Sequence, residues 1–244
     1  LKQWLHWMKN DIGFGGWRFD FVKGYGGNFT GEYVGDTKPY VSVGEHWVAC
    51  NYNGGNLEYN QDSHRQSTFD WCASPGGSTA AFDLTTKGIL QEALRNREYW
   101  RLQGSDGHPA GFCGKWPTHA VTFIENHDTG STQGHWRFPG GYEQQGYVYS
   151  LTHPGTPTVF WDHVFEWAED PLLGETIEKL IRFRDERGVN ARSVCKILKA
   201  EQSVYAAQID DSLVMKIGPG AFSPADEDWE YHTHGIEWCL WRRK

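Results

Sequence analysis

Short, continuously apolar runs recur along the first two thirds of the chain. Polar and apolar positions do not alternate within them, which is typical of strands buried on both faces of a parallel sheet. The runs cover residues 16–22, 39–47, 79–85, 119–128 and 156–163. We therefore predict five parallel strands.

Helical periodicity fills the intervals between these runs. The first eight residues have apolar positions at helical spacing, and Gly13 is placed to end that helix. Further helices are predicted over residues 86–102, 142–155 and 174–188. Strand alternating with helix indicates βα units and an α/β fold.

The pattern changes after Gly188. Residues 189–244 contain short apolar segments joined by tight turns, with Asp210-Asp211 as one turn. This predicts a small antiparallel β-sheet domain over 189–244, following an α/β domain over 1–188.

Composition excludes several classes of protein. The chain has 244 residues and a net charge of −8, and its 23 basic residues are scattered, so it offers no nucleic-acid patch. No apolar run approaches the roughly 18 to 20 residues of a membrane span. The five cysteines are widely spaced, which excludes a zinc site or a dense disulfide framework but leaves one oxidised pair open.

Thirteen tryptophans and 29 glycines are unusually many for this length. Several tryptophans stand beside polar residues and glycines, where loops and strand ends are expected. Flat amphipathic rings at such places suit a ligand with an apolar face and polar edges, such as a sugar. The alternative is that most of these rings fill the core.

The stretch GGWRFDF, residues 15–21, places two opposite charges in an apolar setting. Along a strand, Arg18 and Asp20 share one face while Trp17, Phe19 and Phe21 share the other. A buried charge is costly unless it is paired or used. Taken alone, the stretch is equally well explained by a structural ion pair and by a functional site.

Three of the five apolar runs end in a carboxylate, namely Asp20, Glu45 and Asp128. Parallel α/β folds build their active sites at the carboxyl ends of strands. A pair of carboxylates across a glycosidic bond is the equipment of a glycosidase. In that interpretation Arg18 keeps Asp20 ionised, so that Asp20 acts as a nucleophile.

Six sequence blocks, in this order, resemble those of plant-type α-amylases, members of glycoside hydrolase family 13. The blocks are GWRFDFVKGY, VGEHW, YNQDSHRQ, FDLTTKGIL, FIENHDTGSTQ and GYVYSLTHPGTPTVFWDH. The resemblance covers nearly the whole chain and weakens after about residue 218. It implies a partial (β/α)8 TIM barrel, containing strands four to eight, followed by the small β domain.

The resemblance implies a role for each matching residue. Asp20 is implied to be the nucleophile, Glu45 the general acid/base and Asp128 the stabiliser of the transition state. Arg18 is implied to orient Asp20, and His127 to hydrogen-bond the substrate sugar.

Three further residues fall at positions that have a role in the family. Lys23 and Trp47 are implied to contact leaving-group sugars, and the Gly24 carbonyl is implied to bind a structural calcium ion. Each also has a simpler explanation: Lys23 as a solvated charge, Trp47 as a core residue and Gly24 as a turn.

Two departures from the family pattern stand out. Plant relatives often carry paired tryptophans where this chain has Lys115-Trp116, which puts a starch-granule surface site in doubt. The family also has aspartate where this chain has Glu125, ahead of Asn126, His127 and Asp128.

We therefore expect a retaining endo-hydrolase of α-1,4-glucosidic bonds in starch and maltooligosaccharides, with no nucleic-acid or membrane partner. The whole protein is expected to be a calcium-binding monomer, in a plastid or secreted. Because the chain begins at Leu1 inside a helix and lacks strands one to three, we expect a fragment that is inactive alone. The alternatives are a truncated, non-catalytic glucan-binding homologue and a related debranching or transferring enzyme.

Overall fold

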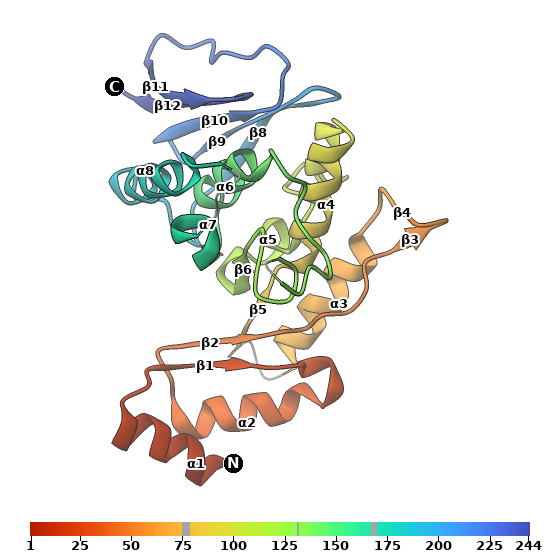
Figure 1. Ribbon diagram of the computed structural model, residues 1–244, viewed down its shortest axis with the longest axis vertical. Helices are drawn as coiled ribbons and strands as arrows, with labels where there is room; N and C mark the ends of the chain where they lie inside the picture. The colour runs from red at the N-terminus through yellow and green to blue at the C-terminus, as the bar shows by residue number, and fades with distance from the viewer. Residues whose placement is uncertain (75–78, 131, 167–169) are drawn as a thin grey trace.

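Five strands form a parallel sheet in the order β1-β2-β5-β6-β7. The computed structural model describes residues 1–74, 79–130, 132–166 and 170–244. The strands are β1 (Gly16–Phe19), β2 (Val41–Gly44), β5 (Ala80–Phe82), β6 (Ala120–Thr122) and β7 (Thr156–Pro157). Helices connect successive strands, so the predicted partial barrel is confirmed (Figure 1).

Each strand is shorter than its apolar run because the residues after it turn away from the sheet. Phe21 adopts a left-handed conformation with φ of 46°, which ends β1 two residues earlier. The Asp83 side chain caps the next helix by accepting from the Thr86 N–H at 2.8 Å, which ends β5 at Phe82. The last run, 156–163, becomes a two-residue strand followed by a short helix from Trp161.

Helices cover the parallel sheet. The α-helices are α1 (Lys2–Trp7), α2 (Gly27–Thr37), α3 (Asp62–Ala73), α4 (Leu84–Arg95), α5 (Phe112–Lys115), α6 (Glu143–Thr152), α7 (Trp161–Phe165) and α8 (Leu173–Glu186). The shorter turns are a π-helix η1 (Met8–Ile12) and the 3-10 helices η2 (Val22–Gly24), η3 (Tyr99–Leu102) and η4 (Pro117–His119). A small hairpin consists of β3 (Tyr52–Asn53) and β4 (Asn56–Leu57).

The helix predictions hold except at one place. Gly13 and Gly188 end their helices with φ of 95° and 68°, as glycine allows. The continuous helix predicted over 86–102 is wrong: α4 stops at Arg95 and the chain resumes as η3, because Arg97 takes a left-handed conformation with φ of 54°.

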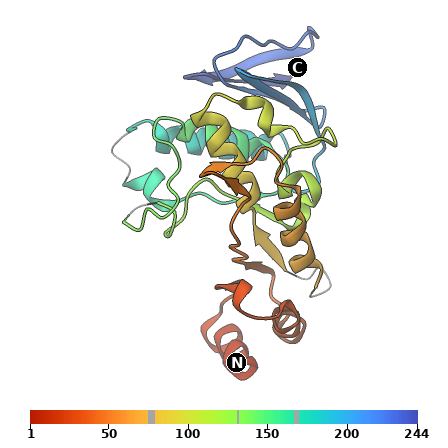
Figure 2. The ribbon, with the colours of Figure 1, turned by 90° about the vertical axis from the view of Figure 1, so that its right-hand side faces the viewer.

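The last fifth of the chain forms a five-stranded antiparallel sheet in the order β11-β12-β10-β9-β8. Its strands are β8 (Cys195–Glu201), β9 (Val204–Ile209), β10 (Leu213–Ile217), β11 (Trp229–Gly235) and β12 (Trp238–Arg243). The β9–β10 turn is at Asp210, with φ of 50°, as predicted. This sheet lies at the opposite end of the molecule from α1 and β1 (Figures 1 and 2).

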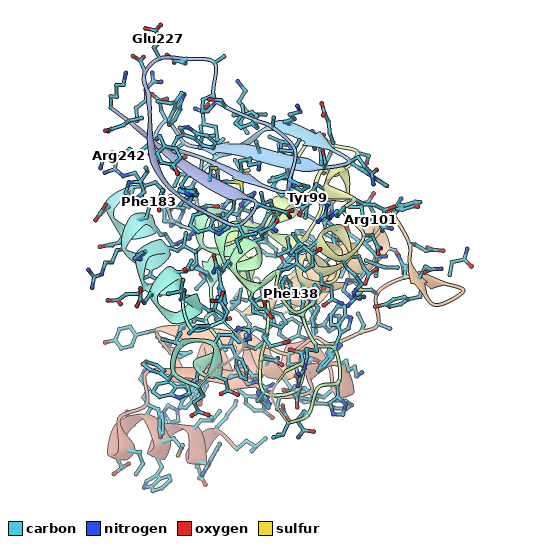
Figure 3. The ribbon with its side chains drawn as sticks, turned by 45° about the horizontal axis from the view of Figure 1, so that its top comes forward. Tyr99, Arg101, Phe138, Phe183, Glu227 and Arg242 are labelled. Atoms are coloured by element: carbon cyan, nitrogen blue, oxygen red, sulfur yellow. The ribbon has the colours of Figure 1, made fainter. Side chains whose placement is uncertain are left out.

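One hydrophobic core joins the antiparallel sheet to the helices α4, α6 and α8. Polar contacts fix the same junction: Gln145 Oε1 accepts from the Tyr99 hydroxyl at 2.8 Å and from the Gly218 N–H at 3.1 Å. Tyr99 and Phe183 both lie beneath this sheet (Figure 3). The antiparallel sheet therefore packs on helices of the α/β domain, whereas buried residues of β5 and β6 belong to a second cluster with α3 and α5.

Two expectations about the chain's chemistry can be compared with the structure. All five cysteines lie among the described residues and all are free thiols, so no pair is oxidised. Within the described ranges, no helix has the length and apolar character needed to cross a bilayer.

Candidate active site

The carboxyl ends of β1 and β2 bring Asp20 and Glu45 together. Phe19 is in register with Gly44, so the next residue of each strand stands at the same level of the sheet. The Glu45 N–H donates to the Phe19 carbonyl at 2.9 Å, which fixes this alignment beyond the last strand pair. The sequence prediction that both carboxylates mark strand ends therefore holds in space.

Arg18 bridges the two carboxylates. Its Nη1 contacts Asp20 Oδ1, and its Nη2 lies 3.0 Å from Glu45 Oε1. The other oxygen of Glu45 accepts from the Phe21 N–H at 3.1 Å. One guanidinium thus orients both acids.

The predicted burial of the charged pair is wrong. The Asp20 side chain is 76% exposed and that of Arg18 is 32% exposed, whereas that of Glu45 is only 9% exposed. Phe21, expected to pack with Trp17, is also exposed. The reason is that β1 is the edge strand of the described sheet, and a hollow of about 620 Å³ with apolar walls opens beside it.

The turn after Asp20 is strained. A left-handed phenylalanine costs on the order of 1–3 kcal/mol, and the contact between its N–H and Glu45 holds it in place. A Cβ on Gly24 would lie 2.7 Å from the Phe21 ring, so a larger residue there would displace this exposed ring. Lys23 is exposed, with its ammonium 5.3 Å from the same ring.

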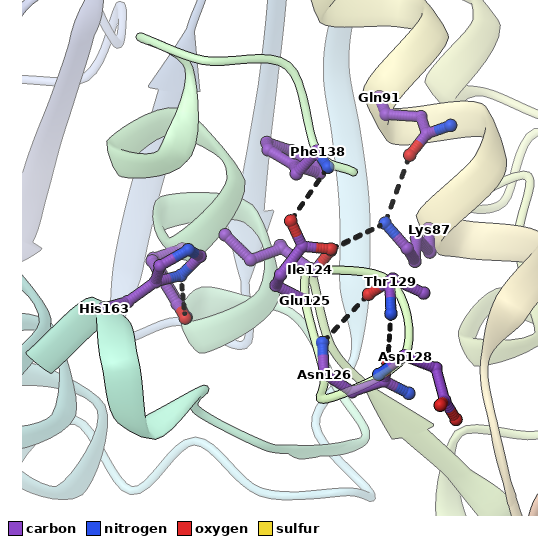
Figure 4. A network of polar contacts seen from close by, with 10 residues as sticks. Lys87, Gln91, Ile124, Glu125, Asn126, Asp128, Thr129, Phe138 and His163 are labelled. Atoms are coloured by element: carbon purple, nitrogen blue, oxygen red, sulfur yellow. Dashed lines mark hydrogen bonds and ion pairs between the residues drawn. The ribbon is translucent and has the colours of Figure 1, made fainter. Parts of the chain in front are cut away.

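Asp128 is held by a compact turn after β6 (Figure 4). The Asn126 side-chain oxygen accepts from the N–H groups of Asp128 and Thr129, at 3.0 and 2.8 Å. The His127 Nε2 lies 3.2 Å from Asp128 Oδ2, and the His127 ring is largely exposed. Ser131 of the FIENHDTGSTQ block lies outside the described residues.

The buried ion pair between Lys87 and Glu125 lies directly before the turn that carries Asp128. Lys87 donates to the Ile124 carbonyl at 2.8 Å, and its Nζ lies 3.5 Å from Glu125 Oε1. Glu125 Oε2 accepts from the Phe138 N–H at 3.0 Å. Glu125, the departure from the family pattern, is therefore a structural anchor immediately before Asn126.

Stacked tryptophans connect the loop after β2 with the loop after β6. Trp47, two residues beyond Glu45, stacks on Trp136 with ring centroids 6.4 Å apart. Trp136 in turn lies 5.0 Å from the Lys87 ammonium. The stack therefore links the two loops through their aromatic rings.

Sequence reasoning missed three buried polar residues beside the site. Asp83 ends the third apolar run as the other carboxylates end theirs, but it is fully buried and accepts from the Cys113 N–H at 2.7 Å, so it is structural. His46 stacks on Trp71, and burial lowers its pKa to about 4, which keeps it neutral. The signal for Lys87 was a charge directly before the apolar Gly88-Ile89-Leu90 segment of a helix.

The implied calcium site can be compared with the side chains of the described residues. They contain no group of three or more histidine, cysteine, aspartate or glutamate side chains that could hold a metal ion. Calcium takes about six to eight oxygen ligands, of which a single carbonyl such as that of Gly24 could supply only one. A separate point concerns Lys115-Trp116, where plant relatives often carry paired tryptophans. Trp116 stacks on His119, with ring centroids 3.7 Å apart, and packs against Phe69.

Comparisons with known proteins agree with this architecture. Residues 186–242 match the family model of the alpha-amylase C-terminal beta-sheet domain. The crystal structure of an *Anoxybacillus* α-amylase is similar, with a TM-score of 0.66 at 14% identity, over 99% of this chain and 62% of that one. At this identity the likeness concerns the fold alone.

Curated plant proteins are much closer in sequence. Probable alpha-amylase 2 of *Arabidopsis thaliana* is 48% identical over 98% of this chain and 57% of its own length. Alpha-amylase 3, chloroplastic, of the same plant is 49% identical over 99% of this chain and 27% of its own length. The chain thus spans about half or less of these relatives.

A shorter relative is covered almost completely. The alpha-amylase type B isozyme of *Hordeum vulgare* is 40% identical over 148 residues, which are 59% of this chain and 93% of that one. Together with the matching C-terminal domain and the paired carboxylates at the strand ends, this shows that the chain belongs to the α-amylase family, glycoside hydrolase family 13.

Proposed function

We propose that the protein of which this chain is a part hydrolyses α-1,4-glucosidic bonds of starch and maltooligosaccharides with retention of configuration. The observation that carries the proposal is the Arg18 bridge between Asp20 and Glu45. A retaining pair needs carboxyl groups roughly 5 to 5.5 Å apart, and two acids on one guanidinium suit that spacing.

The proposed steps use both acids. Asp20, ionised beside Arg18, attacks the anomeric carbon, while protonated Glu45 gives its proton to the departing glycosidic oxygen. Glu45 then takes a proton from water, whose oxygen displaces Asp20 from the sugar. Asp128 holds substrate hydroxyls and His127 hydrogen-bonds the same sugar, while Lys23 and Trp47 contact the leaving-group sugars.

The 244-residue polypeptide by itself is proposed to be inactive. Asp20 is mostly exposed beside the apolar hollow at the free edge of β1, so water is not excluded from the reacting atoms. Five strands do not close an eight-stranded barrel. Calcium, for which Gly24 would supply one carbonyl, needs most of its ligands from elsewhere.

The test uses the full-length protein with Asp20→Asn and Glu45→Gln. Each variant should lose at least about 1,000-fold in amylose hydrolysis, because the nucleophile or the proton donor is gone. Maltooligosaccharide affinity should remain within a few-fold, since both amides keep the shape of the acids. Near wild-type rates would overturn the catalytic assignment, and a wild type that binds without hydrolysing would favour the glucan-binding alternative.

The remaining features of the whole protein are proposals of the same kind. We propose a monomer located in a plastid or secreted, and one Arabidopsis relative is named as chloroplastic.

A further inference from the structure

A polar groove lies on the outside of the barrel, between the β3–β4 hairpin and the C-terminal end of α4. Its main hollow measures about 650 Å³, and a smaller one of about 190 Å³ adjoins it. Both hollows are lined by Tyr59, Asn60 and Arg101. Arg101 lies on the side of the molecule from which the hairpin projects (Figure 3).

An aromatic platform separates the two hollows. Tyr59 packs on Trp100 with ring centroids 5.0 Å apart, and the Arg101 guanidinium carbon lies 4.2 Å from the Tyr59 centroid. Tyr59 is nevertheless 65% exposed. The Tyr59 ring therefore packs against Trp100 and Arg101, while the residue as a whole stays open to a ligand.

Arg101 itself is not available to a ligand. Its side chain is 7% exposed, and it donates to Glu98 Oε2 at 2.6 Å and to the Leu57 carbonyl at 3.2 Å. Its role is to fix Tyr59 and to join η3 to the hairpin.

The rim of the larger hollow supplies hydrogen-bonding groups. Amides and carboxylates line it, from Asn53, Asn56, Asn60, Glu58, Glu92 and Glu98. Glu92 pairs with Arg95 and Glu98 with Arg101, so two of the three carboxylates have a cationic partner. No cluster of metal-binding side chains occurs among the described residues. Planar polar groups around a fixed aromatic ring, with little net charge, suit a neutral polyhydroxylated ligand.

We propose that this groove, the Tyr59 groove, binds a neutral oligosaccharide, and that the occupant is an α-1,4-glucan chain. The choice of glucan rests on the proposed function, whereas the site itself rests on the groove. None of its lining residues belongs to the group of Arg18, Asp20, Glu45 and Asp128. The groove is therefore a second point of attachment for a polymer.

The experiment titrates the 244-residue chain with maltoheptaose and measures both affinity and amide hydrogen exchange. Maltoheptaose should protect residues 52–60 and 98–104. Tyr59→Ala should weaken this binding fivefold or more and abolish the local protection. Tyr59→Phe, which keeps the ring, should bind within twofold of wild type and also shows that substitution at this position is tolerated.

Tyr40→Ala is the matched control, because Tyr40 is an almost fully exposed tyrosine outside the groove. Its affinity should stay within twofold of wild type. Absence of protection at 52–60, or equal affinity of Tyr59→Ala and Tyr40→Ala, would overturn the proposal. Preference for a cationic peptide over maltoheptaose would overturn it as well.

The two proposals fail separately. Protection at 52–60 in a protein that never hydrolyses amylose would retain the groove and reject the catalytic function. Amylose hydrolysis without protection at 52–60 would support the catalytic function and reject the Tyr59 groove as a binding site.

Discussion

The Nζ of Lys87 lies 3.5 Å from Oε1 of Glu125, and both side chains are withdrawn from solvent. Burial lowers the pKa of Lys87 to about 8, against the opposing attraction of Glu125. Because Glu125 also accepts from the Phe138 N–H, this pair ties α4 to both ends of the loop that carries Asp128.

Lys87→Met should lower the free energy of unfolding by about 3–5 kcal/mol, because it leaves the Glu125 carboxylate buried and unpaired. Urea denaturation of the 244-residue chain measures this. Lys87→Met combined with Glu125→Leu should recover most of the loss, since no charge then remains buried. An unchanged midpoint in the single variant would contradict the role of the pair.

Asp83→Ala should destabilise the fold without a specific effect on catalysis. Asp83 caps α4 and accepts from the N–H groups of Phe112 and Cys113, and each donor left unpaired in the interior costs about 1–3 kcal/mol. In the full-length enzyme, kcat per folded molecule should stay near wild type. A loss of kcat comparable to that of Asp20→Asn would show that Asp83 is catalytic.

Acidification should weaken the junction between α6 and the antiparallel sheet through His153. This ring is fully buried against the Tyr205 hydroxyl at 2.9 Å, and burial lowers its pKa to about 3. Between pH 6.5 and 3 the unfolded chain binds a proton that the native state does not, so stability falls as pH falls. At pH 5, protonation of the unfolded chain at His153 lowers the free energy of unfolding by about 2 kcal/mol relative to neutral pH.

Thermal unfolding measured from pH 7 to pH 4.5 checks this expectation. His153→Phe should reduce the dependence of Tm on pH in that window. If Tm of His153→Phe depends on pH as it does in the wild type, groups other than His153 control the loss of stability at low pH.

Arg18→Lys should lower kcat of the full-length enzyme by about 100-fold, or about 2.7 kcal/mol in activation free energy, with little change in KM. A lysine ammonium is a point charge and does not reproduce the two-nitrogen contact with Asp20 and Glu45. Steady-state kinetics on maltoheptaose measures kcat and KM of the variant and the wild type. A change confined to KM would instead assign Arg18 to ground-state binding.

Calcium should bind the 244-residue chain with no better than millimolar affinity, since one carbonyl at Gly24 is far from the six to eight oxygens required. The full-length protein should bind it tightly and lose thermal stability on addition of a chelator. Isothermal titration of both proteins makes the comparison. Micromolar affinity in the short chain would contradict the proposed division of ligands.

Local pattern was sufficient to predict the five strands of the parallel sheet and the strand-end carboxylates, but it did not predict the helices α2 and α3. The continuous apolar runs gave the places of the strands, and Asp20 and Glu45 directly follow β1 and β2. The predicted burial on both faces holds for β6, whereas β1 and β2 each carry an exposed residue. The breaks at Phe21 and Arg97 were not predictable, because a left-handed conformation at a non-glycine residue is imposed by its contacts and not by its own preference.

What the sequence by itself determined was therefore the order of the five parallel strands, the change to an antiparallel domain after Gly188 and the identity of the candidate acids. Only the tertiary structure decided which charges are buried. Asp83 and Asp20 each follow a strand. Asp83 is fully buried against α4 and α5, whereas Asp20 is exposed at the open edge of the parallel sheet. Burial depends on which segments, distant in sequence, cover a residue, and a local pattern does not contain that information.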